Sequence, residues 1–279
     1  MNSILKLFAI ILLCSSQIVA AAEFNYNRAI NLAGKQRMLT QKMSKEALLV
    51  ALEINQDENL QNLKQTRDLF DKTIIGLKDG DTDLGLDKTK KPKIRKQLSK
   101  VQKLWKGFDA AITKIINNKS VSSFEVDTIA QLNLPLLKEM NRGVKFYETS
   151  AASSGVNQAL AKAINLSGRQ RMLTQKMSKE FYLVAYGHNA DQNRDKLIGT
   201  VTLFGTILNG LIDGNAKLGL PAAPTPELKE QLLKVKKIWT IFSANITAEP
   251  DVQTSKVVAE KNIPLLREMN KAVQMYEEL

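Results

Sequence analysis

Two nearly identical stretches hold the side chains of this sequence that are best suited to chemistry. Residues 31–46 read NLAGKQRMLTQKMSKE, and residues 165–180 read NLSGRQRMLTQKMSKE. Each contains an arginine in the same place, Arg37 and Arg171. Because a guanidinium is flat, always charged and able to donate several hydrogen bonds, it suits planar or tetrahedral oxyanions. The pair therefore indicates a binding site for a small anion.

On a helix, each arginine belongs to a polar stripe that begins with a glycine. At about 3.6 residues per turn, the stripe takes one residue from each successive turn of the repeated stretch. A glycine inside a helix costs about 1 kcal/mol relative to alanine, so we expect it to let a ligand or another backbone come close. The candidate ligand-binding residues are Arg37, Arg171, Gly34, Gly168, Gln41, Gln175, Ser44 and Ser178.

The near-identity of the two stretches indicates a shared polar task. They differ at two positions only, one of which is Lys35 in the first copy and Arg169 in the second. A packed core accepts swaps between aliphatic residues of similar volume, so packing alone would not keep every polar residue. The remaining faces of the helix have ordinary roles: an apolar face for the core, and a side with Lys42 and Glu46 that we expect to reach water.

The repeated stretches begin two units of a repeat that covers most of the chain. Further along, residues 133–148 match residues 262–277. We predict two domains, residues 23–150 and 151–279, joined by the small-residue stretch TSAASSGV.

Each unit is predicted to form four helices and no strand. Apolar residues recur at helical spacing, and clusters rich in Gly, Pro and Asp separate the segments. Four amphipathic helices with short links favour an all-α fold of two tandem four-helix bundles with up-down-up-down topology. In the first unit the expected helices span residues 25–54, 57–78, 92–117, and 122 or 123 to 148.

A structural role for the arginines is the main alternative. A buried guanidinium is costly unless it has a partner, and each fourth helix keeps an acid, Glu139 or Glu268, that could pair with it inside one bundle. The nearby amides Asn141 and Asn270 are expected to be ordinary helix-surface residues.

Residues 1–22 are expected to be a cleaved signal peptide. They combine Lys6, an apolar run over residues 4–13, and small residues before the first acid. The run is too short for a comfortable membrane span, and an uncleaved N-terminal anchor is the alternative. Cys14 is the only cysteine and lies in this segment, so the exported chain would have no disulfide and no thiolate metal site.

The composition is that of a folded, basic protein without signs of catalysis. Its 279 residues are 44% hydrophobic, enough to fill real cores, and its formal net charge is +12. Basic residues scattered along helices usually form a solvated face, and no aromatic residues alternate with them as nucleic-acid binding would favour. His188 is the only histidine and has no counterpart in the first unit. We therefore expect no enzyme, no cofactor, no metal site and no nucleic-acid partner.

The sequence resembles a family of periplasmic sensing domains, the PilJ-type domain or N-terminal domain of type IV pili methyl-accepting chemotaxis transducers. The resemblance rests on INLAGKQRMLTQKMSK and INLSGRQRMLTQKMSK and extends over both repeats. This family is related to the sensor domains of nitrate/nitrite histidine kinases. The resemblance implies four-helix bundles whose first helices meet between two protomers, where an arginine from each grips one anion. By motif alignment these arginines are Arg37 and Arg171, and Gly34 and Gly168 match the family's small residue one turn earlier.

The resemblance implies a periplasmic protein that binds a nitrate- or nitrite-like oxyanion, as a sensor or accessory binding protein. The duplication suggests that both arginines converge on one anion within an intramolecular pseudo-dimer, and a homodimer is the other arrangement. Family members usually continue into a membrane span and a signalling module, whereas this sequence stops at Leu279. We therefore expect a membrane-bound sensor or chemotaxis partner. The alternative function is a helical interaction module that docks such a partner without binding a ligand.

Overall fold

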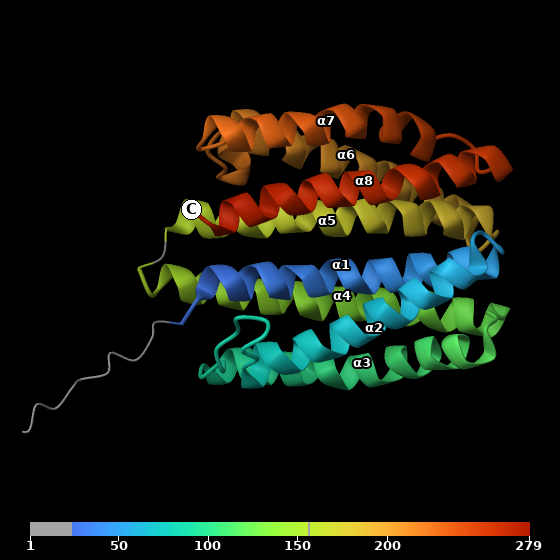
Figure 1. The fold of residues 1–279 in the computed structure, drawn as a ribbon, viewed down its shortest axis with the longest axis horizontal. Helices are drawn as coiled ribbons and strands as arrows, with labels where there is room; N and C mark the ends of the chain where they lie inside the picture. Colours follow the sequence, from blue (N-terminus) through green and yellow to red (C-terminus); the bar gives the residue numbers. More distant parts are fainter. Residues whose placement is uncertain (1–23, 156) are drawn as a thin grey trace, which may run out of the picture.

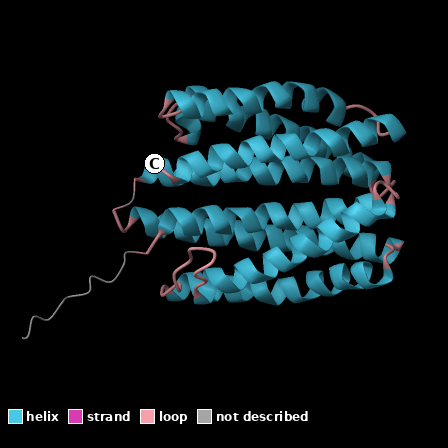
Figure 2. Ribbon diagram, in the orientation of Figure 1, coloured by secondary structure: helices cyan, strands magenta, loops and turns pink. Residues whose placement is uncertain are grey.

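The computed structural model describes residues 24–155 and 157–279. The expected signal peptide, residues 1–22, lies outside the described residues, and Cys14 with it. Figure 1 shows two groups of helices, one formed by each repeat. Figure 2 shows that helices joined by loops make up the described part of the chain. The structure confirms the prediction of an all-α fold with two four-helix units.

The first unit consists of α1 to α4, and local sequence signals set the ends of these helices. The first turn of α3 contains Pro92, where no helical N–H is needed. The N–H of Ser122, just before α4, donates to the Glu125 carboxylate at 2.9 Å. The residue that follows α2 is Gly80, whose φ of 92° favours glycine. The bounds are Tyr26–Ala51 for α1, Gln56–Asp79 for α2, Pro92–Asn118 for α3 and Ser123–Ala152 for α4.

The second unit repeats these elements from α5 to α8. Gly214 follows the last residue of α6, and the short 3-10 helix η1, Ala216–Leu218, comes next. The side chain of Asp251 caps α8 by accepting from the N–H of Thr254 at 2.6 Å. The bounds are Gln158–Ala185 for α5, Ala190–Asp213 for α6, Pro226–Ile246 for α7 and Val252–Glu277 for α8.

Each unit has an aromatic cluster at equivalent repeat positions. The ring centroids of Phe70 and Trp105 lie 4.2 Å apart, and those of Phe204 and Trp239 lie 4.3 Å apart. Both phenylalanines are fully buried. These contacts pack α2 against α3 and α6 against α7, so each unit holds its outer helices by the same means.

The two units meet along α1 and α5, the helices that carry the repeated stretches. Figure 1 shows these helices side by side at the centre, both beginning at the same end of the molecule. Most residues of both helices are buried as a result. Their polar residues therefore lie at the junction of the units.

None of the described helices is long and apolar enough to cross a lipid bilayer.

Candidate anion-binding site

Arg37 lies in the interior and reaches from α1 into the second unit. The residue is 1% exposed. Its Nη1 donates to Oδ1 of Asn141 on α4 at 2.8 Å, and its Nη2 donates to the backbone carbonyl of Asn165 on α5 at 3.1 Å. The guanidinium therefore contacts both units.

Arg171 makes the equivalent contacts in the opposite direction. It is 2% exposed, and its Nη1 donates to Oδ1 of Asn270 on α8 at 2.7 Å. Its Nη2 donates to Asn31 on α1, at 2.7 Å to Oδ1 and 3.3 Å to the backbone oxygen. Because Arg37 and Arg171 hold equivalent repeat positions, an approximate two-fold rotation relates the two sets of contacts.

The two glycines leave room for the guanidinium groups beside the helices. A Cβ at Gly168 would lie 3.5 Å from Nη2 of Arg171 and 3.8 Å from Nη2 of Arg37, so both arginines approach this glycine. A Cβ at Gly34 would lie 3.3 Å from Nη2 of Arg37. The structure thus brings four of the predicted residues, Gly34, Arg37, Gly168 and Arg171, to one place.

Neither arginine is part of an ion pair among the residues that the structure describes. In residues 24–155 and 157–279, no carboxylate oxygen lies within 4.0 Å of either guanidinium, and the Nε–H of each lacks a hydrogen-bond partner. Burial lowers the pKa of Arg37 to about 9, with further lowering by Arg169 and Arg171. Burial also lowers the pKa of Arg171 to about 10. Both groups stay protonated at neutral pH, so the junction holds two buried cations close together.

Two carboxylates contact the asparagines that hold the arginines, and not the arginines themselves. Glu148 accepts from Nδ2 of Asn165 at 3.0 Å, and Glu277 accepts from Nδ2 of Asn31. Glu148 raises the pKa of Arg37, and Glu277 raises that of Arg171, although burial dominates in both cases. These acids orient the asparagines that the arginines contact, and they leave the Nε–H groups unpaired.

The structure contradicts the alternative in which each arginine pairs with an acid of its own bundle. Glu139 contacts Lys100 at 3.2 Å and accepts from Gln97 at 2.8 Å, so it is already satisfied away from Arg37. The expectation that Asn141 is an ordinary surface amide is also wrong, because it accepts from Arg37. An amide can hold a guanidinium in place without neutralising its charge.

Gln41 and Ser44 lie further along α1 and belong to a different set of contacts. Nε2 of Gln41 donates to Oδ1 of Asn133 on α4 at 2.9 Å, and Nδ2 of Asn133 donates to Oγ of Ser44 at 2.8 Å. Asn262 holds Gln175 and Ser178 in the same way, at 2.8 Å and 2.7 Å. In the described structure these four predicted residues therefore link helices within each unit.

Two lysines that sequence reasoning missed cross the junction at this level. Nζ of Lys45 donates to Oδ1 of Asn262, and Nζ of Lys179 donates to Oδ1 of Asn133, each at 3.2 Å. Burial lowers the pKa of both lysines to about 8. These lysines, and the asparagines in NLPLL and NIPLL, are retained in both repeats, and this is the sequence signal that could have identified them.

Glu46, expected to reach water, is buried and pairs with Lys42.

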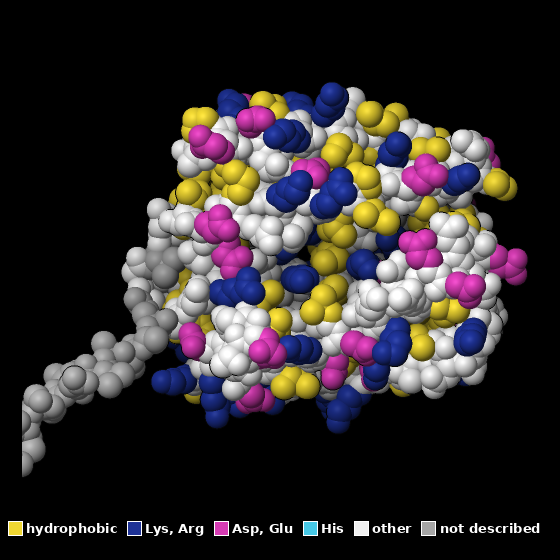
Figure 3. Space-filling model, in the orientation of Figure 1, with side chains coloured by type: hydrophobic (Ala, Val, Ile, Leu, Met, Phe, Trp, Pro, Cys, Tyr) yellow, Lys and Arg dark blue, Asp and Glu magenta, His cyan; other side chains and the backbone are white. Residues whose placement is uncertain are grey.

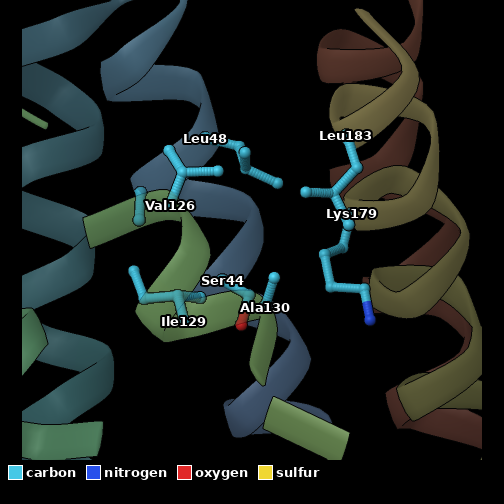
Figure 4. A pocket seen from close by; sticks show the side chains of 8 residues that line it. Ser44, Leu48, Val126, Ile129, Ala130, Lys179 and Leu183 are labelled. Carbon is cyan, nitrogen blue, oxygen red and sulfur yellow. The ribbon is translucent and has the colours of Figure 1, made fainter. Parts of the chain in front are cut away.

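A small apolar cavity lies between the two units near Lys179, as Figure 4 shows. Leu48, Val126 and Ile129 of the first unit line it opposite Leu183 of the second, and the Lys179 side chain runs alongside. Its volume is about 10 Å³, which is room for about one water molecule. It is too small and too apolar to hold the anion that the sequence predicts.

The chain is similar to one protein family over most of its length. Residues 20–126 and residues 154–263 each match the family described as "Type IV pili methyl-accepting chemotaxis transducer N-term". The two matches fall on the two repeat units, so each unit by itself has the character of this family.

Two proteins of Pseudomonas aeruginosa are also similar to the chain. The chain is 24% identical to "Protein PilJ" over 252 residues, and this matched region covers 87% of this chain and 35% of PilJ. It is 28% identical to "Methyl-accepting chemotaxis protein McpN" over 124 residues, and this matched region covers 44% of this chain and 22% of McpN. The chain therefore spans much less than the full length of either relative.

Proposed function

The chain belongs to the family of type IV pili methyl-accepting chemotaxis transducer N-terminal domains, and from this membership we propose that it is a sensor or accessory binding protein for a small oxyanion. The anion lies between Arg37 and Arg171 at the junction of α1 and α5. Its class is that of nitrate and nitrite: planar, singly charged, and able to accept hydrogen bonds from two guanidinium groups. In this proposal the protein binds the anion and does not catalyse a reaction.

The observation that carries this proposal is the pair of buried arginines, which have no ion-pair partner in the described part of the chain. Two such charges in one place cost several kcal/mol unless an opposite charge compensates them. Arg37 and Arg171 come from equivalent positions, and each has an unpaired Nε–H. An anion between them would accept from both groups and offset their repulsion. Both arginines lie against Gly168, so the anion would lie close to this glycine.

In this proposal one chain supplies both halves of the site. One anion per chain is then sufficient, and binding requires no second copy of the protein. We place the protein in the periplasm, where the expected signal peptide would send it. A membrane-bound sensor or chemotaxis protein would receive the signal.

A thermal-shift screen with nitrate, nitrite, sulfate, phosphate and chloride at constant ionic strength tests the proposal. A ligand of the folded state at about 100 times its Kd adds about 2.7 kcal/mol of stability. We expect a selective rise in Tm with a planar oxyanion, lost in Arg37→Lys and in Arg171→Lys. Lysine keeps the charge but lacks the planar fork of donors. No selective shift with the folded wild-type protein would contradict the proposal and favour an interaction module.

A further inference from the structure

A pair of grooves flanks the α1–α5 junction, related by the same approximate two-fold rotation. The first groove lies between α1 and α2 of one unit and α8 of the other, with a volume of about 1060 Å³. The second lies between α5, α6 and α4 and consists of two adjoining hollows of about 600 Å³ and about 480 Å³. Figure 3 shows one face of the molecule, which is hollowed between the units. Both grooves have the size of small-molecule sites.

The two grooves differ in charge despite their common origin. The second groove has the basic residues Lys138, Arg169, Lys176, Lys179 and Lys196, and the acids Asp127 and Glu180. The first groove has the lysines Lys42, Lys45 and Lys256, and the acids Glu46, Glu53, Glu58, Asp251 and Glu260. Only the second groove therefore has an excess of positive charge.

Substitutions at equivalent positions cause this difference. Asn62 of the first groove corresponds to Lys196 of the second, and Glu58 corresponds to Gln192. Arg169 also lines the second groove, but its counterpart Lys35 is equally basic, so this position does not contribute to the difference in charge. The positive charge has thus gathered on one side of an otherwise symmetrical junction.

Three of these cations are available to a ligand. In residues 24–155 and 157–279, no carboxylate oxygen lies within 4.0 Å of the charged nitrogens of Lys138, Arg169 or Lys196. Lys196 donates to the neutral side chain of Gln192, at 2.9 Å. Lys176, in contrast, pairs with Glu180. The groove therefore presents positive charge that the protein itself does not neutralise.

An apolar wall lies beside these cations. Leu134, Leu137, Met172 and Leu203 line the same hollow, and Leu134 is 42% exposed. A ligand that placed a carboxylate among the cations could lay a hydrocarbon part on this wall and remove it from water. Nitrate and similar ions have no such part, so the groove suits a different chemical class from the arginine pair.

We propose that the groove between α4, α5 and α6 is a second ligand site, specific for an organic anion with a carboxylate and an apolar body. The site is separate from the arginine pair, although Asn141 lies at the edge of both: it lines the groove and accepts from Arg37. Lys138, Arg169 and Lys196 hold the carboxylate, and the leucines hold the apolar body.

Titration of the full-length protein with hexanoate, followed by saturation-transfer NMR, tests this site. Hexanamide, which has the same apolar body without the charge, is the control ligand. We expect saturable hexanoate binding that Lys138→Gln combined with Lys196→Asn weakens at least about fivefold. The matched control is Lys236→Gln with Lys237→Asn, which removes the same charge from the exposed side of α7. We expect this control to bind hexanoate like the wild type.

The Arg171→Lys variant separates this proposal from the anion site of the arginine pair, because Arg171 contacts Asn270 and Asn31, which do not line the groove. If hexanoate binds a separate groove, it binds this variant as it binds the wild type, whether or not nitrate binding is lost. Absence of saturable hexanoate binding would overturn the proposal. Equal weakening by the α7 control, equally strong binding of hexanamide, or loss of hexanoate binding in Arg171→Lys would overturn it as well.

Discussion

Arg37 in the first repeat donates a hydrogen bond across the junction to the backbone carbonyl of Asn165 in the second repeat, 3.1 Å away. Arg171 in the second repeat makes the equivalent hydrogen bond to the backbone carbonyl of Asn31 in the first repeat. Because each arginine is anchored on one unit and held by the other, an anion bound to both would tie the position of α1 to that of α5. A sensor built on this junction would convert ligand binding into a shift between two packed units.

The substitution Gly168→Ala separates stability from anion binding. Alanine in place of a helical glycine raises the free energy of unfolding by about 1 kcal/mol. A Cβ here meets Nη2 of both arginines at ordinary contact distances, so the fold can accept it. It also fills space that the anion would use, and we expect nitrate to stabilise this variant less than the wild type. Urea denaturation with and without nitrate measures both effects.

Gly199→Ala is the matched control for that experiment. Gly199 lies inside α6, and a Cβ there would have no neighbour within 4 Å among the described residues. We expect a similar gain in stability with no change in the response to nitrate. An equal loss of the nitrate response in both glycine variants would contradict a site beside Gly168.

Asn133→Ala should destabilise the protein by about 3 kcal/mol. This side chain is 1% exposed and accepts from Gln41 and Lys179, so its loss leaves buried donors without a partner. Gln131→Ala, on the exposed side of the same helix, should change stability by less than about 0.5 kcal/mol. Chemical denaturation of both variants checks this, and similar stability of the two would contradict a structural role for Asn133.

The buried lysines predict a rise in stability with pH above about 8. Burial lowers the pKa of Lys45 from 10.5 to about 8; Glu46 and Glu58 oppose this change, and Lys42 adds to it. Between these two values the unfolded state binds more protons than the folded state, so the free energy of unfolding increases with pH. Each lysine contributes up to about 1.4 kcal/mol per pH unit.

Lys45→Met isolates this contribution. We expect its free energy of unfolding to rise less than that of the wild type between pH 8 and about 10, because the titrating group is gone. Denaturation curves at several pH values give the difference directly. Parallel curves for the two proteins would mean that Lys45 keeps an ordinary pKa in the folded state.

Sequence reasoning was sufficient for the helices because their signals are local. The spacing of apolar residues and the caps around Ser122 and Pro92 lie within short segments, and the structure places helix ends close to the expected ones. The comparison of the two repeats also singled out Arg37 and Gly34, which need a reason to be kept at equivalent places.

The partners of those residues could not be predicted from one helix at a time. The face of α1 shows that Arg37 is semi-buried, but the register between α1, α4 and α5 decides that it meets Asn141 and Asn165. That register depends on packing between segments far apart in the chain. For the same reason the crossing contact of Lys45 with Asn262 escaped notice.

The central claim is that one anion is shared by two arginines of one chain, and calorimetric titration with nitrate tests it most directly. We predict a stoichiometry of one nitrate per chain for the wild type, and loss of binding in Arg37→Lys as well as in Arg171→Lys, with both variants folded. Two nitrates per chain, with each single variant retaining one, would show that the arginines act independently. That result, or no nitrate binding by the folded wild-type protein, would contradict the account.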